Sequence, residues 1–132
     1  MNDCIFCKII SGNAPCYKIY EDTDTLAFLS IANDYYGHTL VIPKKHCESI
    51  LDADEKTMSS VMKAVQKISN HYVQKLGYDG VNVFINNGAA SGQVVFHLHM
   101  HIAPRKKGVE HKWGTTIERD FKAEQQFLKL GR

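Results

Sequence analysis

Three histidines occupy alternate positions in segment 96–102, where the sequence reads Phe-His-Leu-His-Met-His-Ile. Side chains alternate between the two faces of a β-strand, so a strand here places His97, His99 and His101 on one face. The apolar residues between them then occupy the opposite face, which we expect to be the core face. Such a row is hard to obtain by chance, and it indicates a functional site.

Two kinds of chemistry use a row of imidazoles. Neutral imidazoles on alternate residues can bind zinc or another transition-metal ion. Alternatively, the central imidazole can attack phosphorus as a nucleophile while its neighbours orient it and transfer protons. The uncharged amides of Asn86 and Gln93, and the close backbone approach that Gly92 permits, suit the oxygens of a phosphoryl transition state. These neighbours favour covalent catalysis.

The chain contains four cysteines, Cys4, Cys7, Cys16 and Cys47. The first two form a Cys-x-x-Cys pair, which as a redox motif would need a thioredoxin-like βαβ context that this sequence lacks. Zinc would need further ligands, and the nearest candidates are His46 and one of the three alternating histidines. Two buried thiols beside an ordinary surface histidine are the alternative. For the other two cysteines no partner is predicted.

Length and composition indicate one soluble domain over residues 1–132. The 44% hydrophobic and 23% charged content is ordinary for a globular protein. A net charge of +2 is too small to indicate nucleic acid or a membrane surface as a partner. The first residues lack the basic and apolar regions of a signal peptide, so we expect a cytoplasmic location with reduced cysteines.

The elements expected to position these residues form an α+β domain with a five-stranded antiparallel sheet. Strands are predicted over residues 18–21, 25–30, 38–42, 81–86 and 94–102. Apolar residues recurring every three or four positions predict one long helix over 52–76, with Asp52 and Glu55 as its capping pair and Gly77 at its end. Shorter helices are predicted near 4–10 and 121–130. Residues 106–132 are expected to form a tail, either an ordered arm or a frayed end.

The histidine row matches the signature His-φ-His-φ-His-φ-φ, in which φ is apolar, and further segments match in order and spacing. These are 4–10 (Cys-Ile-Phe-Cys-Lys-Ile-Ile), 26–28 (Leu-Ala-Phe), 37–46 (Gly-His-Thr-Leu-Val-Ile-Pro-Lys-Lys-His), 86–88 (Asn-Asn-Gly) and 91–93 (Ser-Gly-Gln). Over roughly residues 4–105 the chain therefore resembles the Hint branch of the histidine-triad (HIT) superfamily. The resemblance implies the HIT fold, a homodimer, and hydrolysis of purine nucleoside phosphoramidates or related AMP conjugates.

The resemblance also implies roles for individual residues. His99 would be the nucleophile that becomes nucleotidylated, His101 would lie beside the phosphate and the leaving group, and His38 would complete the histidine cluster. The phosphate would be held by Asn86, Gly92 and Gln93, and the base and ribose pocket would be lined by Ile5, Phe6, Ile9, Phe28, Leu29 and Ile31. Some relatives carry zinc, and the matching positions here are Cys4, Cys7, His46 and His97, a closed structural set.

Two residues of the nucleotide site depart from the family pattern. Ser30 stands where the pattern usually has an aspartate that accepts hydrogen bonds from the ribose diol, and a hydroxyl is a weaker acceptor than a carboxylate. Val94 stands where a serine or threonine usually serves the leaving group. We therefore expect slow or altered phosphoramidase activity.

Three alternatives stay open at this point. The same chemistry could hydrolyse dinucleoside polyphosphates, or transfer the nucleotide to an acceptor other than water. The chain could be a nucleotide-binding or scaffold protein with weak catalysis. All three histidines of the row could instead bind a metal ion.

Overall fold

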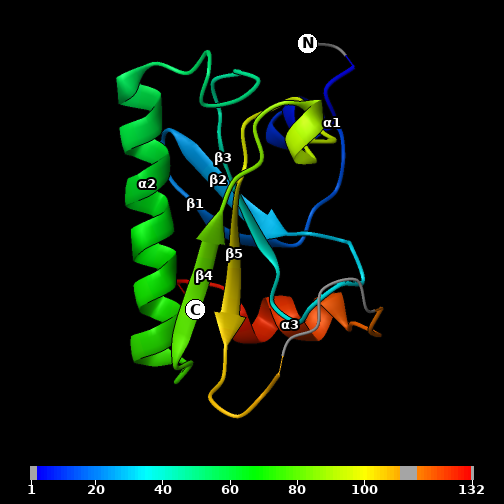
Figure 1. Cartoon of the computed structure of the whole chain (residues 1–132), viewed down its shortest axis with the longest axis vertical. Coiled ribbons are helices and arrows are strands. Elements are labelled where there is room, and N and C mark those ends of the chain that lie inside the picture. Colours follow the sequence, from blue (N-terminus) through cyan, green and yellow to red (C-terminus); the bar gives the residue numbers. More distant parts are fainter. Residues whose placement is uncertain (1–2, 111–115, 132) are drawn as a thin grey trace.

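The computed structural model describes residues 3–110 and 116–131 (Figure 1). In chain order its elements are α1 (Ile5–Ile10), β1 (Lys18–Glu21), β2 (Thr25–Leu29), β3 (Thr39–Pro43), α2 (Glu55–Asn70), a π-helical turn (His71–Lys75), β4 (Gly80–Phe84), a 3-10 turn (Ala89–Ser91), β5 (Met100–Arg105) and α3 (Phe121–Leu128).

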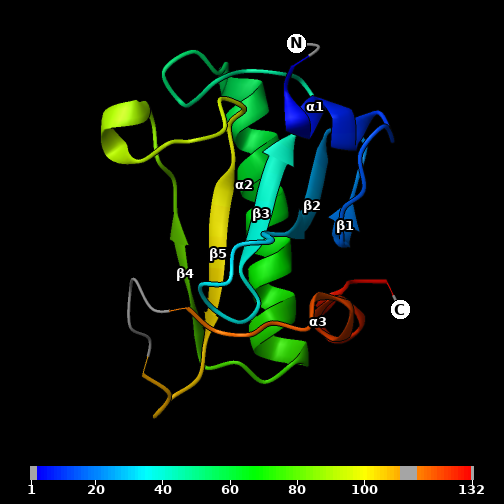
Figure 2. The same cartoon turned by 90° about the vertical axis from the view of Figure 1, so that its right-hand side faces the viewer.

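The five strands form one antiparallel sheet in the order β1-β2-β3-β5-β4. The long helix α2 covers one face of this sheet, whereas α1 and the loop around the 3-10 turn lie at one end of the opposite face (Figures 1 and 2). The predicted α+β class, the five-stranded antiparallel sheet, the long helix and the short N-terminal helix are all confirmed.

The main core lies between α2 and the sheet. Val61, Val65 and Ile68 of the helix are almost completely buried against it, and Leu98 and Ile102 belong to the same cluster. Each such side chain contributes about 1.5–3 kcal/mol to folding when fully buried. The apolar residues between the histidines therefore do mark the core face, as the alternation predicts.

The strand that was predicted over 94–102 is displaced toward the C-terminus. β5 begins only at Met100, because β3 pairs with it no further than Val41, opposite Met100. Before that point the backbone N–H of Leu98 donates to the carbonyl of Cys47 at 2.8 Å, outside the ladder. His97 and His99 consequently lie in an irregular segment that leads into the strand, yet the apolar and histidine side chains still alternate.

The long helix also begins later than predicted. Asp54, in an extended conformation, is its N-cap and accepts a hydrogen bond from the backbone N–H of Thr57 at 2.7 Å. Asp52 instead accepts from the N–H groups of Glu48 and Ser49 in the preceding turn, so it caps that turn and not the helix.

The C-terminal segment is packed onto the domain where it is described. Leu128 of α3 is fully buried in the main core, and the N–H of Leu130 donates to the carbonyl of Ile19 at 3.0 Å. Residues 116–131 are thus part of the domain and not a loose tail. Among the described helices, none has the length and apolar character needed to cross a membrane.

Candidate functional site

A cavity of about 630 Å³ is lined by residues of α1, β2, β3 and β5 and of the loop around the 3-10 turn. This volume lies in the range of small-molecule sites, roughly 300–1,000 Å³. Its apolar wall contains all six residues predicted for the base and ribose pocket, Ile5, Phe6, Ile9, Phe28, Leu29 and Ile31. Its polar part contains Ser30, His38, Asn86, Gly92, His99 and His101, together with Val94.

His99 is the buried imidazole at the centre of this polar part. Its Nδ1 lies 2.7 Å from the carbonyl oxygen of His97, and because that oxygen can only accept, Nδ1 must carry the proton. The neutral ring then keeps its basic lone pair on Nε2, for which the described residues offer no hydrogen-bond partner. Burial lowers the pKa of His99, which keeps the ring neutral. A neutral imidazole with a fixed tautomer is the form required of a nucleophile.

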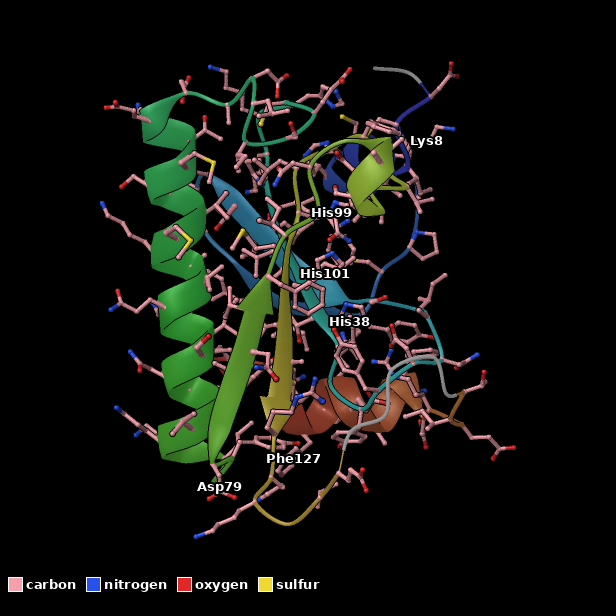
Figure 3. The ribbon with its side chains drawn as sticks, in the orientation of Figure 1. Lys8, His38, Asp79, His99, His101 and Phe127 are labelled. Carbon is pink, nitrogen blue, oxygen red and sulfur yellow. The ribbon has the colours of Figure 1, made fainter. Side chains whose placement is uncertain are left out.

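His38 and His101 form a second pair of imidazoles beside it. His38 Nε2 lies 2.8 Å from His101 Nδ1, and the two rings stack with centroids 5.1 Å apart. His99, His101 and His38 follow one another in a column along the sheet (Figure 3). Burial lowers the pKa of His38, and it lowers that of His101 to about 3. Phe84 stacks on the other side of His101 at 4.5 Å.

The loop predicted to hold a phosphate places two of its three residues in the cavity. Asn86 and Gly92 line it, and Gly92 has a φ of +100°, a conformation that L-residues with side chains rarely adopt. A Cβ there would make ordinary van der Waals contact with the Asn86 amide at 3.7 Å, so the backbone conformation is what favours glycine. The absence of a side chain thus leaves the backbone of this loop accessible.

Gln93 is the third predicted phosphate ligand, and the structure does not place it in the cavity. Its side chain is buried, and its Oε1 accepts from the N–H of Gly88 at 2.8 Å. Its Nε2 donates to the carbonyls of Glu48 at 2.6 Å and Val95 at 3.0 Å. The amide is therefore engaged in holding the loop. The phosphate contact expected of Gln93 stays a prediction.

Four side chains converge at the N-terminal end of α1. Cys4, Cys7, His46 and His97 each offer one ligand atom, and these four atoms lie within 4.8 Å of one another. Several pairs are closer, such as Cys4 Sγ to His97 Nδ1 at 3.4 Å and Cys7 Sγ to His46 Nδ1 at 3.3 Å. Tetrahedral zinc, with bonds of about 2.0–2.3 Å, holds its ligand atoms roughly 3.3–3.8 Å apart. The four residues could hold a metal ion.

The hydrogen bonds around this cluster suit metal ligation. His97 Nε2 donates to the carbonyl of Pro43 at 2.8 Å, so the lone pair of the neutral ring is on Nδ1, which faces the other three ligand atoms. Burial lowers the pKa of His97 to about 4, which keeps it neutral. The N–H of Cys7 donates to Cys4 Sγ at 3.3 Å. An outer carbonyl that fixes the tautomer of a ligating histidine is typical of metal sites.

The two departures from the family pattern both lie in the cavity wall. The Ser30 hydroxyl accepts from the N–H of Ala32 at 3.3 Å, and its carbonyl accepts from Arg119 Nη1 at 2.6 Å. Val94 is 84% exposed, so its side chain neither packs in the core nor offers a polar group to a ligand.

Two charged residues near the site were not predicted from the sequence. Asp34 lies 3.0 Å from His38 Nδ1, and Arg119 bonds the loop that contains Ser30. Asp34 precedes His38 by four positions, but no helical or strand periodicity marks that segment. Arg119 is separated from Ser30 by 89 residues, and only the fold brings them together. Cys16, for which no partner was predicted, also lines the cavity.

Comparison with known proteins gives a family match over most of the chain. The model of the HIT domain family matches residues 11–108. An uncharacterized HIT-like protein of Borreliella burgdorferi is 50% identical over 109 residues, which is 81% of this chain and 78% of that protein.

Two further relatives have names that mention an activity or a bound metal ion. A protein of Arabidopsis thaliana named adenylylsulfatase HINT3 is 45% identical over 106 residues, 80% of this chain but only 54% of that protein. The crystal structure of a zinc-bound histidine triad family protein from Mycobacterium smegmatis superimposes with a TM-score of 0.87 at 37% identity, covering 97% of this chain and 91% of that one.

Proposed function

The chain belongs to the HIT domain family, and we propose that it hydrolyses purine nucleoside phosphoramidates or related AMP conjugates. The superfamily to which this family belongs consists of nucleotide hydrolases and transferases. His99 attacks the α-phosphate in this proposal. The observation that supports it most directly is the tautomer of His99. Its Nδ1–H donates to the carbonyl of His97, which leaves a basic Nε2 in a residue that lines the cavity.

The reaction then takes two steps. In the first, the Nε2 lone pair of His99 forms a bond to phosphorus while the bond from phosphorus to the leaving nitrogen breaks, and the departing amine gains a proton. In the second, water attacks the same phosphorus, loses a proton, and the electron pair of the P–N bond returns to Nε2. His101 lies beside His99 with ring centroids 4.9 Å apart, and in this proposal it gives the first proton and takes the second.

The cavity divides in a way that suits a nucleotide. Phe6, Phe28 and their aliphatic neighbours would enclose the base, and Ser30 would lie near the ribose. The phosphate would lie between His99, the amide of Asn86 and the backbone of Gly92. Ser30 offers the ribose a neutral hydroxyl, so discrimination between ribose and 2′-deoxyribose should be weaker than a carboxylate would give.

A zinc ion belongs to the same proposal as a structural group. Cys4, Cys7, His46 and His97 would hold it, leaving no open position for a substrate. Bound there, it would join α1 to the segment that contains His99. The relative from M. smegmatis that is described as zinc-bound adds support.

Elemental analysis of the protein purified without added metal should find about one zinc per chain. Cys7→Ser should lose that zinc and lower the free energy of unfolding by several kcal/mol, since a ligand present at a thousand times its Kd contributes about 4 kcal/mol. Cys16→Ser, outside the cluster, is the matched control and should retain the metal. Folded, active protein free of metal would contradict a structural zinc.

The homodimer, the lack of nucleic acid and membrane partners, and the cytoplasmic location stay predictions. Support for the dimer comes from β4, which is an edge strand with the exposed apolar residue Val83. An unpaired edge of this kind is suited to pairing with a second chain.

Steady-state hydrolysis of two substrates tests the proposed function. The wild-type protein should release AMP and ammonia from adenosine 5′-phosphoramidate, and should cleave a diadenosine polyphosphate more slowly. In the same assay Val94→Ser should raise the rate, because a hydroxyl at that exposed position can serve the leaving group. AMP binding without turnover of either substrate would instead favour a nucleotide-binding or scaffold protein. Turnover that depends on added metal would favour a metalloenzyme.

A further inference from the structure

A carboxylate extends the pair of imidazoles beyond the cavity. The two oxygens of Asp34 lie 3.0 and 3.1 Å from Nδ1 of His38, and His38 Nε2 lies 2.8 Å from Nδ1 of His101. The side chain of His38 is almost completely buried, whereas that of Asp34 is 38% exposed. Three ionisable groups thus form a chain that starts near the surface and ends at the cavity.

The donors in this chain follow from its first member. An ionised carboxylate can only accept, so His38 Nδ1 must carry a proton. The Nε2 of a neutral His38 is then an acceptor, and His101 Nδ1 must donate to it. A neutral His101 is left with its lone pair on Nε2. This atom is buried and has no hydrogen-bond partner among the described residues.

We propose that Asp34 is a positioning residue that turns His38 and His101 into a two-imidazole proton relay serving the reaction at His99. The inference rests on the proposed function, and it adds Asp34 as a residue that positions the proton relay. Asp34 acts through His38 and does not itself reach the reacting atoms.

The protons balance if the relay begins the reaction with one extra proton. His38 is then an imidazolium beside Asp34, and its Nε2 donates to His101 Nδ1, whose Nε2 now carries a proton toward the cavity. That proton passes to the departing amine, and the Nε2 proton of His38 moves to His101 Nδ1. In the second step His101 Nε2 takes a proton from the attacking water while the Nδ1 proton of His101 returns to His38 Nε2, which restores the starting state.

The other charged groups around the relay do not stabilise a protonated His38 as Asp34 does. Arg119, from the C-terminal segment, lies 4.0 Å from Asp34, but its guanidinium is paired at 2.7 Å with Glu124. Tyr35 stacks on the ring of His38 at 4.3 Å, and Arg105 of β5 lies over Tyr35. His99 adds a further imidazole beside His101. Among residues 3–110 and 116–131, Asp34 is the carboxylate that contacts the pair.

The charge of Asp34 sets the direction of the expected pH effect. Burial lowers the pKa of His38 and of His101, and the Asp34 carboxylate opposes this by raising both. Without that charge the relay loses its extra proton at a lower pH. Because the reaction needs the protonated relay, a variant without this charge should lose activity at a lower pH than the wild-type protein does.

Asp34→Asn is the sharpest variant, because it keeps the size and an acceptor oxygen while removing the charge. The value of kcat/KM for adenosine 5′-phosphoramidate should fall about tenfold or more near pH 8 and much less near pH 5.5, since one pKa unit corresponds to a tenfold change. Asp24→Asn removes the same charge from a turn outside the cavity and should leave the pH profile unchanged. An Asp34→Asn loss that is equal at every pH, or no loss, would overturn the relay.

A second measurement determines the ring tautomers of His38 and His101 and does not depend on an activity assay. In ¹⁵N-labelled wild-type protein, ring nitrogen shifts should show His38 and His101 protonated on Nδ1 near neutral pH, and Asp34→Leu should abolish that preference at His38. Unchanged tautomers in Asp34→Leu would overturn the proposal. If the wild-type protein shows these tautomers but no turnover, the proposed function fails and the relay fails as a catalytic device, while the fixed tautomers stand as structure.

Discussion

His99→Ala is expected to abolish hydrolysis of adenosine 5′-phosphoramidate while AMP still binds. We expect kcat to fall by a thousandfold or more, since removing the nucleophile of a well-studied triad costs on the order of 10⁶. AMP should still bind because the apolar wall of the cavity, which includes Phe6 and Phe28, does not depend on this imidazole. Calorimetry with AMP and steady-state kinetics measure the two effects separately.

His71→Ala is the matched control for this variant. His71 follows α2 on the other side of the sheet and contacts the carbonyl of Leu128, so its loss should leave kcat unchanged. Thermal unfolding of both variants would show that they remain folded. Retained turnover in His99→Ala, or an equal loss of AMP binding, would contradict a nucleophilic role.

Arg119→Met is expected to have the largest effect on stability. The side chains of Arg119 and Glu124 are both fully buried, and the guanidinium also donates to the carbonyls of Ser30 and Ala32 at 2.6 and 2.7 Å. Removing one partner leaves the carboxylate of Glu124 buried without a countercharge, which costs about 3–5 kcal/mol. Denaturant unfolding measures the loss.

A second substitution separates the lost ion pair from lost packing. Adding Glu124→Gln to Arg119→Met removes the uncompensated charge and should restore part of the stability. Lys18→Met, which breaks an exposed pair with Glu21 at 2.9 Å, is the control and should cost about 0–1 kcal/mol. If Arg119→Met costs no more than Lys18→Met, the buried pair does not hold the C-terminal segment in place.

The sequence allowed the fold class and much of the cavity wall to be predicted because local periodicity is preserved in the structure. Leu98 and Ile102 alternate with the histidines and do belong to the core. The long helix likewise follows from the spacing of Val61, Val65 and Ile68. Its first residue did not follow, because Asp52 and Asp54 are both able to cap and only the backbone path of the preceding turn decides between them.

The roles of polar side chains were harder to predict, since a hydrogen bond depends on the three-dimensional position of its partner. Gln93 has the right chemistry for a phosphate, yet its amide bonds Gly88, Glu48 and Val95. Asp34 has no motif to mark it. The tautomers of the histidines are set by backbone carbonyls and by this carboxylate, and no pattern of residue types contains that information.

The central claim is that His99 becomes covalently nucleotidylated. Mixing the wild-type protein with adenosine 5′-phosphoramidate, quenching within the first turnover under alkaline conditions that preserve P–N bonds, and measuring the intact mass tests this directly. A gain of one adenylyl group per chain, located on His99 by peptide analysis and absent from His99→Ala, is the predicted result. Product formation in the first turnover with no adduct, or with an adduct on another residue, would contradict it.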